Sequence, residues 1–237
     1  MTQPLNDPHD SFFRETFSRR EVAEGFLQSY LPPMIVERID WPSLEIAKDS
    51  FVEKALRKHF SDLLYSARFS PHPGPLPEGE GEQGGCGFHH GDRKINIYVL
   101  LEHKSHPDHW VALQLLRYQV RIWELHRKQN PRTPLPPIIP LVLYHGKQCW
   151  RVPDSFYTLF DGLDEALTPY VPDFRYALCD LNLPEPEQIR GTVLSRLVIL
   201  ALKHIFDPEP KSALAQILPL AHDILEKETT LEMLEVL

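Results

Sequence analysis

The chain has 237 residues, of which 42% are hydrophobic and 24% charged, enough to bury the core of one domain, with or without a small appendage. Its formal net charge of −8 argues against a protein that coats nucleic acid without specificity, but not against a nuclease, whose metal site needs carboxylates. Three scattered cysteines, a polar N-terminus and no apolar run of the roughly 18 residues that a membrane span needs lead us to expect a soluble, cytoplasmic protein.

The first 92 residues predict helices, one strand and a flexible segment. Apolar residues recur at helical spacing from Asp10 or Ser11, either of which could cap the helix, until Pro32 ends it. The expected elements, in order, are helix 10–31, a short helix near 34–39, helix 50–60 and strand 61–69. Residues 70–92 are dominated by Pro, Gly and Glu, which predicts a flexible insertion between two strands.

A buried strand over residues 95–103 follows, and it ends in two charged residues. Side chains alternate faces along a strand, so Glu102 and Lys104 point the same way at its end. Pro140 in a later strand indicates an edge or a bulge there. The remaining expected elements are helix 110–129, loop 131–137, strands 138–144 and 174–180, and helices 187–204 and 212–226.

Polar side chains gather on the expected helix 110–129. Gln114, Arg117, Tyr118 and Arg121 are spaced by three and four residues, which predicts one common helical face. Their amide and guanidinium groups are donors that suit a phosphate backbone.

Two carboxylates on neighbouring strands indicate a site for a divalent cation. Mg²⁺ takes only one or two protein carboxylates and completes its octahedron with water and phosphate, so Asp62 and Glu102 would suffice. Lys104 lies one strand step away, where it could orient or deprotonate a water or stabilise charge on a phosphate. The pattern predicts a Mg²⁺-dependent phosphodiesterase, with Mn²⁺ as the alternative ion.

Six stretches carry a family likeness, and three of them contain site residues named above. In chain order they are residues 9–13, 26–32, 61–65, 99–105, 115–118 and 140–146. Together with Asp62, Glu102-x-Lys104 and Gln114-x-x-x-Tyr118, they resemble the recombination-promoting nuclease (Rpn) or putative transposase family, within the PD-(D/E)xK nuclease superfamily. The likeness extends over residues 9–160.

The resemblance implies a DNA endonuclease with a restriction-endonuclease-like core, an α/β fold whose mixed sheet is flanked by helices. By the same resemblance, Asp62 and Glu102 bind the metal, Lys104 is catalytic, and Gln114 with Tyr118 forms the accessory helix motif. Family members often carry Gln where this chain has Lys104, and the lysine, which is usual in the superfamily, favours activity.

We expect residues 1–180 to form the nuclease-like domain, interrupted by the insertion 70–92, and residues 181–237 to form a helical C-terminal region. The expected partner is DNA and not a membrane, and a homodimer is compatible with the sequence. Two rival interpretations stay open. One is a module of the same fold that binds DNA or a protein through Arg117 and Arg121 without cutting, and the other is a decayed, inactive mobile-element protein.

Other chemistries are less well supported. Histidines and a cysteine of the kind that bind zinc occur at Cys86, His89, His90, His106 and His109, but no Cys-x-x-Cys pair accompanies them. The chain also lacks the Gly-x-Ser-x-Gly elbow of serine hydrolases and the phosphate-binding loop of ATPases.

Overall fold

The computed structural model describes residues 8–47, 63–70, 95–182, 189–204 and 218. In chain order its elements are helices α1 (Pro8–Phe17), α2 (Arg20–Tyr30) and α3 (Pro33–Val36), strands β1 (Ile39–Ile46), β2 (Leu63–Phe69) and β3 (Ile95–Lys104), helix α5 (Val111–Gln129), strand β4 (Ile138–Tyr144), the 3₁₀ helices η1 (Phe156–Leu159) and η2 (Glu165–Tyr170), strand β5 (Ala177–Asp180) and helix α6 (Val193–His204).

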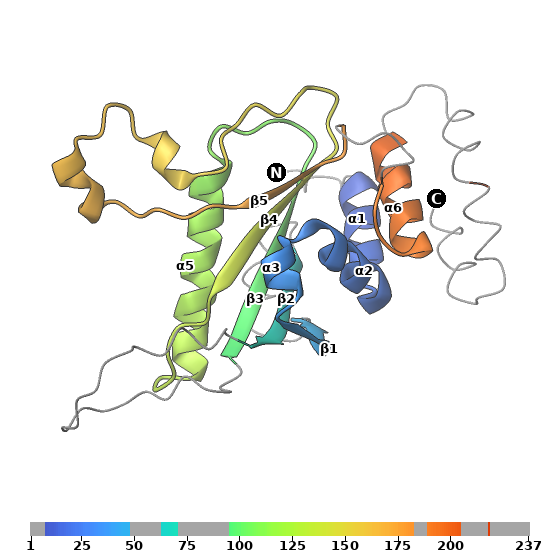
Figure 1. The fold of residues 1–237 in the computed structure, drawn as a ribbon, viewed down its shortest axis with the longest axis horizontal. Coiled ribbons are helices and arrows are strands. Elements are labelled where there is room, and N and C mark those ends of the chain that lie inside the picture. Colours follow the sequence, from blue (N-terminus) through green and yellow to red (C-terminus); the bar gives the residue numbers. More distant parts are fainter. Residues whose placement is uncertain (1–7, 48–62, 71–94, 183–188, 205–217, 219–237) are drawn as a thin grey trace, which may run out of the picture.

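The five strands form one mixed sheet in the order β1-β2-β3-β4-β5 (Figure 1). β1, β2 and β3 are antiparallel neighbours, whereas β3, β4 and β5 run parallel. The parallel step from β3 to β4 needs a crossover, and α5 supplies it. This mixed sheet with flanking helices confirms the expected α/β class and is consistent with a restriction-endonuclease-like core.

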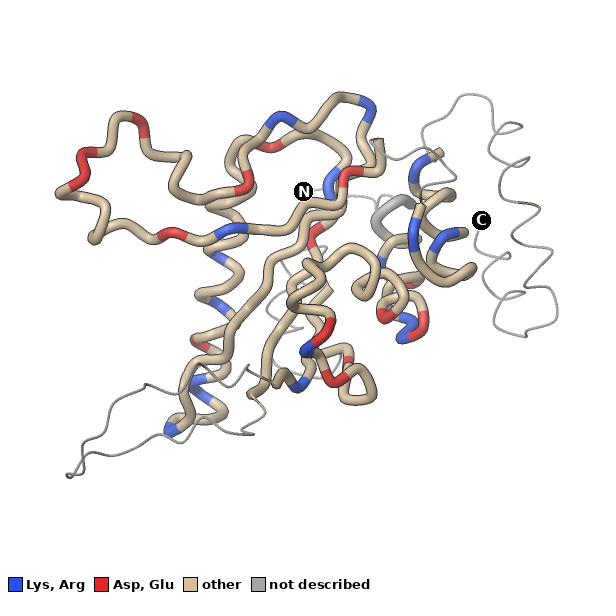
Figure 2. The backbone as a smooth tube through the Cα atoms, viewed as in Figure 1, with Lys and Arg blue, Asp and Glu red and all other residues tan. Residues whose placement is uncertain are grey.

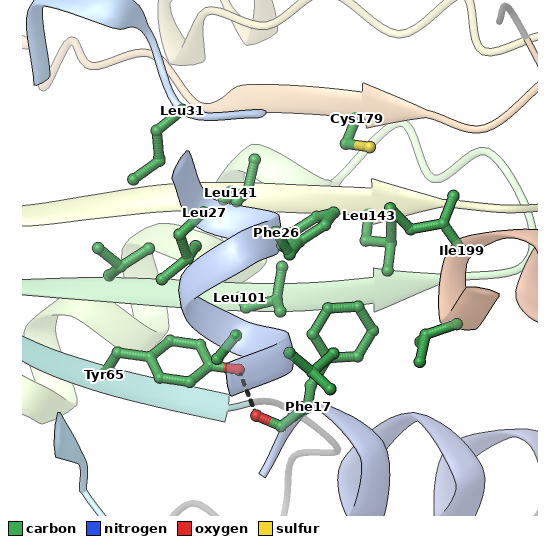
Figure 3. Packing of buried hydrophobic residues seen from close by; sticks show 14 of the residues in the cluster. Phe17, Phe26, Leu27, Leu31, Tyr65, Leu101, Leu141, Leu143, Cys179 and Ile199 are labelled. Carbon is green, nitrogen blue, oxygen red and sulfur yellow. Dashed lines mark hydrogen bonds between the residues drawn. The ribbon is translucent and has the colours of Figure 1, made fainter. Parts of the chain in front are cut away.

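Helices cover both faces of the sheet, and alternation along β3 assigns its side chains to them. Val99 and Leu101 lie in the cluster shared with α1, α2 and α6, whereas Leu100 lies in the cluster shared with α5 (Figure 1). Close to Leu101, the Tyr65 hydroxyl donates a buried hydrogen bond of 2.8 Å to the Phe17 carbonyl oxygen (Figure 3). Because side chains alternate along β3, Glu102 and Lys104 lie on the same face as Leu100 and also face α5.

The expected helix 10–31 is divided into α1 and α2. Along one straight helix the nine steps from Phe17 to Phe26 would span about 13.5 Å. The break after α1 instead brings the two rings to 5.0 Å, where both are fully buried. The helix also begins at Pro8, before Asp10 and Ser11, so the expectation that either residue caps it is wrong.

Edge strand β1 was not expected from the sequence. The short helix α3 ends at Val36, and the chain then enters β1. Pro42 interrupts its alternation, and the pairing with β2 shifts register between Asp40 and Glu45. Proline is tolerated on an edge strand, but it conceals the strand pattern.

Strand β4 agrees with its expected bounds and explains its proline. β4 is interior in the sheet, but the ladder to short β5 begins at Leu141, so at Pro140 no partner strand lies on that side. Pro140 therefore has an edge position, although β4 as a whole lies between two other strands.

Strand β5 and helix α6 both begin later than expected. Before α6, Gly191 has a φ of +120°, which ordinary side chains rarely adopt, and the Thr192 hydroxyl accepts a hydrogen bond of 3.2 Å from the Ser195 amide. The glycine and this cap set the start of the helix, so the expected start at residue 187 is wrong.

Several expectations fall outside the described residues: helix 50–60, Asp62, residues 71–92 of the expected insertion and nearly all of helix 212–226. The division of the chain after residue 180 stays a prediction, while α6 packs into the same cluster as α2. None of the helices within the described ranges is both long and apolar enough to span a bilayer.

Candidate functional site

The site lies at the C-terminal end of β3, on the face that α5 covers. Glu102 is opposite Val142 of β4 and is 2% exposed, so its carboxylate is buried between the sheet and the helix. Lys104 follows on the same face, as expected, with its side chain 16% exposed. A carboxylate at this depth requires partners, because an unpaired buried charge is costly.

One side-chain amide from α5 joins the two charges. Gln114 donates from Nε2 to Oε1 of Glu102 at 2.8 Å and accepts at Oε1 from Nζ of Lys104 at 2.6 Å. Lys104 Nζ also lies 3.2 Å from the same Glu102 oxygen. The three groups close a triangle in which each has two partners, so the expected grouping of Glu102, Lys104 and Gln114 is found.

A second carboxylate that the sequence interpretation missed holds Lys104 from the other side. Asp108 accepts from Lys104 Nζ at Oδ2, 3.0 Å away, and from the Trp110 backbone amide at Oδ1, 2.9 Å away. It lies in the turn between β3 and α5. The available signal was an acid four residues after Lys104 and just before a helix start.

These contacts set the protonation of both groups. Burial lowers the pKa of the Lys104 ammonium, but the charges of Glu102 and Asp108 more than offset it and raise that pKa above 10.5. Burial likewise acts to raise the pKa of Asp108, but the hydrogen bonds from Lys104 and the Trp110 amide hold it below 3.8. At neutral pH the pair is an ammonium and a carboxylate.

The second oxygen of Glu102, Oε2, is the unsatisfied atom of the site. It is buried and accepts no hydrogen bond from the residues that the structure describes. A carboxylate oxygen in this state fits a cation ligand, and Mg²⁺ needs only one or two such ligands from protein. Within the described ranges no three His, Cys, Asp or Glu side chains group as metal ligands.

The second expected ligand, Asp62, lies outside the described residues. It directly precedes Leu63, the first residue of β2, and Leu63 pairs with Leu101, the residue before Glu102. The assignment of Asp62 to the metal therefore stays a prediction. The cysteine and two of the histidines considered for zinc, Cys86, His89 and His90, also lie outside.

The expected polar face of α5 is divided in two. Tyr118 is 2% exposed, and its hydroxyl contacts the Gln114 amide, so it belongs to the buried network. Arg117 and Arg121 are exposed, and Arg121 forms an ion pair with Glu124 at 3.1 Å. Tyr118 therefore lies apart from the two arginines, and only these two are at the surface.

The opposite face of β3 carries a feature that the sequence interpretation did not identify. His103 stacks between Phe13, with ring centroids 4.5 Å apart, and His145, at 4.3 Å. All three rings are buried. The stack anchors α1 to the C-terminal ends of β3 and β4, directly behind Glu102.

A family model described as "Putative transposase, YhgA-like" matches residues 7–74 and 88–232. Residues 75–87 are left unmatched, within the segment 70–92 that we interpret as an insertion. No solved structure matches the chain.

Curated relatives include two proteins named as nucleases. The recombination-promoting nuclease RpnD of Escherichia coli O157:H7 is 29% identical over 84% of this chain and 68% of its own length. RpnC of Escherichia coli K12 is 26% identical over 86% of this chain and 61% of its own. The K12 protein RpnE, named an inactive recombination-promoting nuclease-like protein, is 28% identical over 85% and 60%.

The chain thus spans between 60% and 68% of the length of these relatives. Because the family model matches most of the chain on both sides of the 75–87 gap, the chain belongs to the YhgA-like putative transposase family.

Proposed function

We propose that this chain is a metal-dependent DNA endonuclease that hydrolyses phosphodiester bonds and acts in recombination or with mobile elements. The observation that carries the proposal is the buried, unbonded Oε2 of Glu102 beside the Lys104 ammonium. The names of the relatives RpnD and RpnC support the choice of reaction and of DNA.

The donor set fits a hard divalent cation. Glu102 through Oε2, together with Asp62, would hold Mg²⁺ or Mn²⁺, which when bound supplies a Lewis acid at the phosphate and a more acidic water. Oε1 of Glu102 is already taken by Lys104 and Gln114, which leaves Oε2 as the free ligand atom.

Lys104 acts as a cation in this scheme. Since the carboxylates of Glu102 and Asp108 raise its pKa, it remains an ammonium at neutral pH and is a poor base. Its remaining role is to donate hydrogen bonds to a phosphoryl oxygen or to the attacking water, and to stabilise the negative charge that develops. This favours water orientation over water deprotonation for Lys104.

Gln114 and Asp108 hold the two reacting groups in place. Gln114 fixes the distance between Glu102 and Lys104 because one planar amide bonds both. Asp108, in the turn before α5, accepts a further hydrogen bond from the ammonium and restrains it. The exposed Arg117 and Arg121 are suited to phosphates of the DNA backbone, which would contribute affinity without sequence readout.

The test is plasmid nicking by the full chain with Mg²⁺ and with EDTA. We expect Glu102→Gln and Lys104→Ala to lower the nicking rate about 100-fold or more, since each removes a group that stabilises the transition state. Glu165→Gln, an exposed acid in η2, is the matched control and should nick like the parent. Nicking at the parent rate by Glu102→Gln, or undiminished nicking in EDTA, would refute the proposal.

A second candidate is a DNA-binding protein of the same fold that no longer cleaves. The observation in its favour is the relative RpnE, named inactive. A parent chain that binds DNA in a salt-dependent way but never nicks with either cation would support it. Activity gained on deleting residues 70–92 would instead indicate a decayed nuclease.

A further inference from the structure

The solvent-facing side of α5 is basic in an acidic protein. The helix carries one acid, Glu124, against four Lys or Arg residues, all exposed: Arg117, Arg121, Arg127 and Lys128 (Figure 2). The whole chain has a net charge of −8. A local cationic stripe on such a protein is the electrostatic footprint of a polyanion site.

An exposed aromatic residue stands at the end of this stripe nearest the candidate site. Trp110 precedes α5 and is 56% exposed, with its indole edge-to-face against His109 at 5.2 Å. Its backbone amide bonds Oδ1 of Asp108, and Oδ2 of the same carboxylate bonds Lys104 Nζ. A single carboxyl group therefore connects the Trp110 backbone to the proposed catalytic ammonium.

Trp110 differs from Tyr170, the other strongly exposed Phe, Tyr or Trp within the described ranges. Tyr170 is 83% exposed and belongs to η2. The segment that contains η1 and η2 projects away from the sheet and carries acidic residues such as Asp164 and Glu165 (Figure 2). Phosphates would be repelled there. Among the residues that the structure describes, Trp110 alone combines a strongly exposed aromatic ring with neighbouring cations on α5 and a link to Lys104 through Asp108.

An exposed indole ring that stacks on DNA selects the state of the base that it binds. In an intact duplex both faces of a base are covered by its neighbours, so an aromatic side chain stacks only on bases of a single strand or on a base turned out of the helix. Such stacking tolerates every base, because each has a π-face, and the cations of α5 would follow the backbone.

We propose that Trp110 stacks on an unpaired nucleotide beside the scissile phosphate, and that the substrate class is DNA with unpaired bases. Arg117 and Arg121 would hold the phosphates that continue along α5. The inference rests on the proposed nuclease function, because Lys104 defines where the scissile phosphate lies. Stacking can nevertheless be measured as binding, without cleavage.

The experiment is fluorescence anisotropy with labelled DNA and the full chain in EDTA. The three probes are a single strand, a blunt duplex of the same sequence, and that duplex with one unpaired nucleotide in its middle. The variants are Trp110→Ala and Trp110→Phe, with Tyr170→Ala as the matched exposed aromatic control.

We expect Trp110→Ala to weaken binding of the single strand and of the bulged duplex about tenfold, the loss typical of one base–aromatic stack. Trp110→Phe should recover most of this affinity, and Tyr170→Ala should match the parent on every probe. Binding of the blunt duplex should not change, because its internal bases are covered.

Three results would overturn the inference: a parent that does not bind the single strand, equal losses for Trp110→Ala on all three probes, or an unchanged affinity. These outcomes are separate from the fate of the nuclease proposal. If Glu102→Gln nicks like the parent, the catalytic site is wrong whatever Trp110 does; if only the Trp110 losses fail to occur, the substrate class is wrong.

Discussion

Replacing Lys104 by methionine should destabilise the chain even without metal or DNA. Methionine keeps the apolar length of the side chain but removes the ammonium that neutralises Glu102. The buried Glu102 carboxylate would then keep only its hydrogen bond from Gln114, and Oε2 would remain unbonded. The variant therefore leaves a buried charge without its partner, which destabilises a folded protein strongly.

The magnitude follows from the burial of both partners. Removing one member of a buried pair costs about 3–5 kcal/mol, and we expect about 3 kcal/mol because Lys104 still reaches solvent in part. Glu102→Gln should cost about 1 kcal/mol, since Lys104 keeps Asp108 and no unpaired charge is created. The variant that carries both substitutions should lose about 2 kcal/mol of unfolding free energy, whereas the two single losses add to about 4 kcal/mol. The difference is a coupling free energy of about 2 kcal/mol between the two residues.

The assay is urea unfolding in EDTA at neutral pH, followed by circular dichroism, with the m-value as a check on the unfolded state. Lys147→Met, at an exposed lysine after β4, is the matched control and should lie within about 0.5 kcal/mol of the parent. The reasoning fails if Lys104→Met unfolds at the same urea concentration as Lys147→Met, or if the losses of the two single variants simply add.

Three further outcomes are expected. Asp108→Asn should slow nicking through kcat more than KM, because the substitution removes one of the restraints on Lys104, which keeps Glu102 and Gln114. The loss of unfolding free energy in this variant should be full above pH 3.8, the ordinary pKa of the carboxyl, and should vanish as the pH falls through the lower pKa of Asp108 in the folded chain. Tyr65→Phe should cost about 1–3 kcal/mol of unfolding free energy, because the Phe17 carbonyl is left unsatisfied in the core. Gly146→Ala should lower the melting temperature, since a Cβ there would collide with the backbone carbonyl oxygen of Ser105, just after β3, at a cost of about 1–3 kcal/mol.

Elements with a strong local pattern could be predicted from the sequence. The strands over 95–104 and 138–144 are rich in apolar residues, and the helix over 111–129 has helical periodicity, so the structure reproduces them to within a residue. Strand β1 could not be predicted, because Pro42 and a register shift break its alternation. The break between α1 and α2 depends on packing of Phe17 against Phe26, which no local signal records.

Some residues of the candidate site could likewise be predicted from the sequence, and others could not. Glu102 and Lys104 could be placed together because a strand of period two requires it, and the family likeness supplied Gln114. The contact of Asp108 with Lys104 could not be predicted, because it depends on how the turn after β3 folds back toward the lysine. The spacing of Tyr118 groups it with Arg117 and Arg121 on one helical face. In the structure Tyr118 is instead buried, because the packing of α5 on the sheet decides which residues of the helix face inward.

The most direct test of the metal site is calorimetric titration of Mn²⁺ into the full chain without DNA. We expect one ion to bind the parent and Glu165→Gln alike, and Glu102→Gln to lose affinity by about tenfold or more. Equal Mn²⁺ binding by the parent and Glu102→Gln, or no binding by the parent, would contradict the assignment of Glu102 Oε2 as a metal ligand.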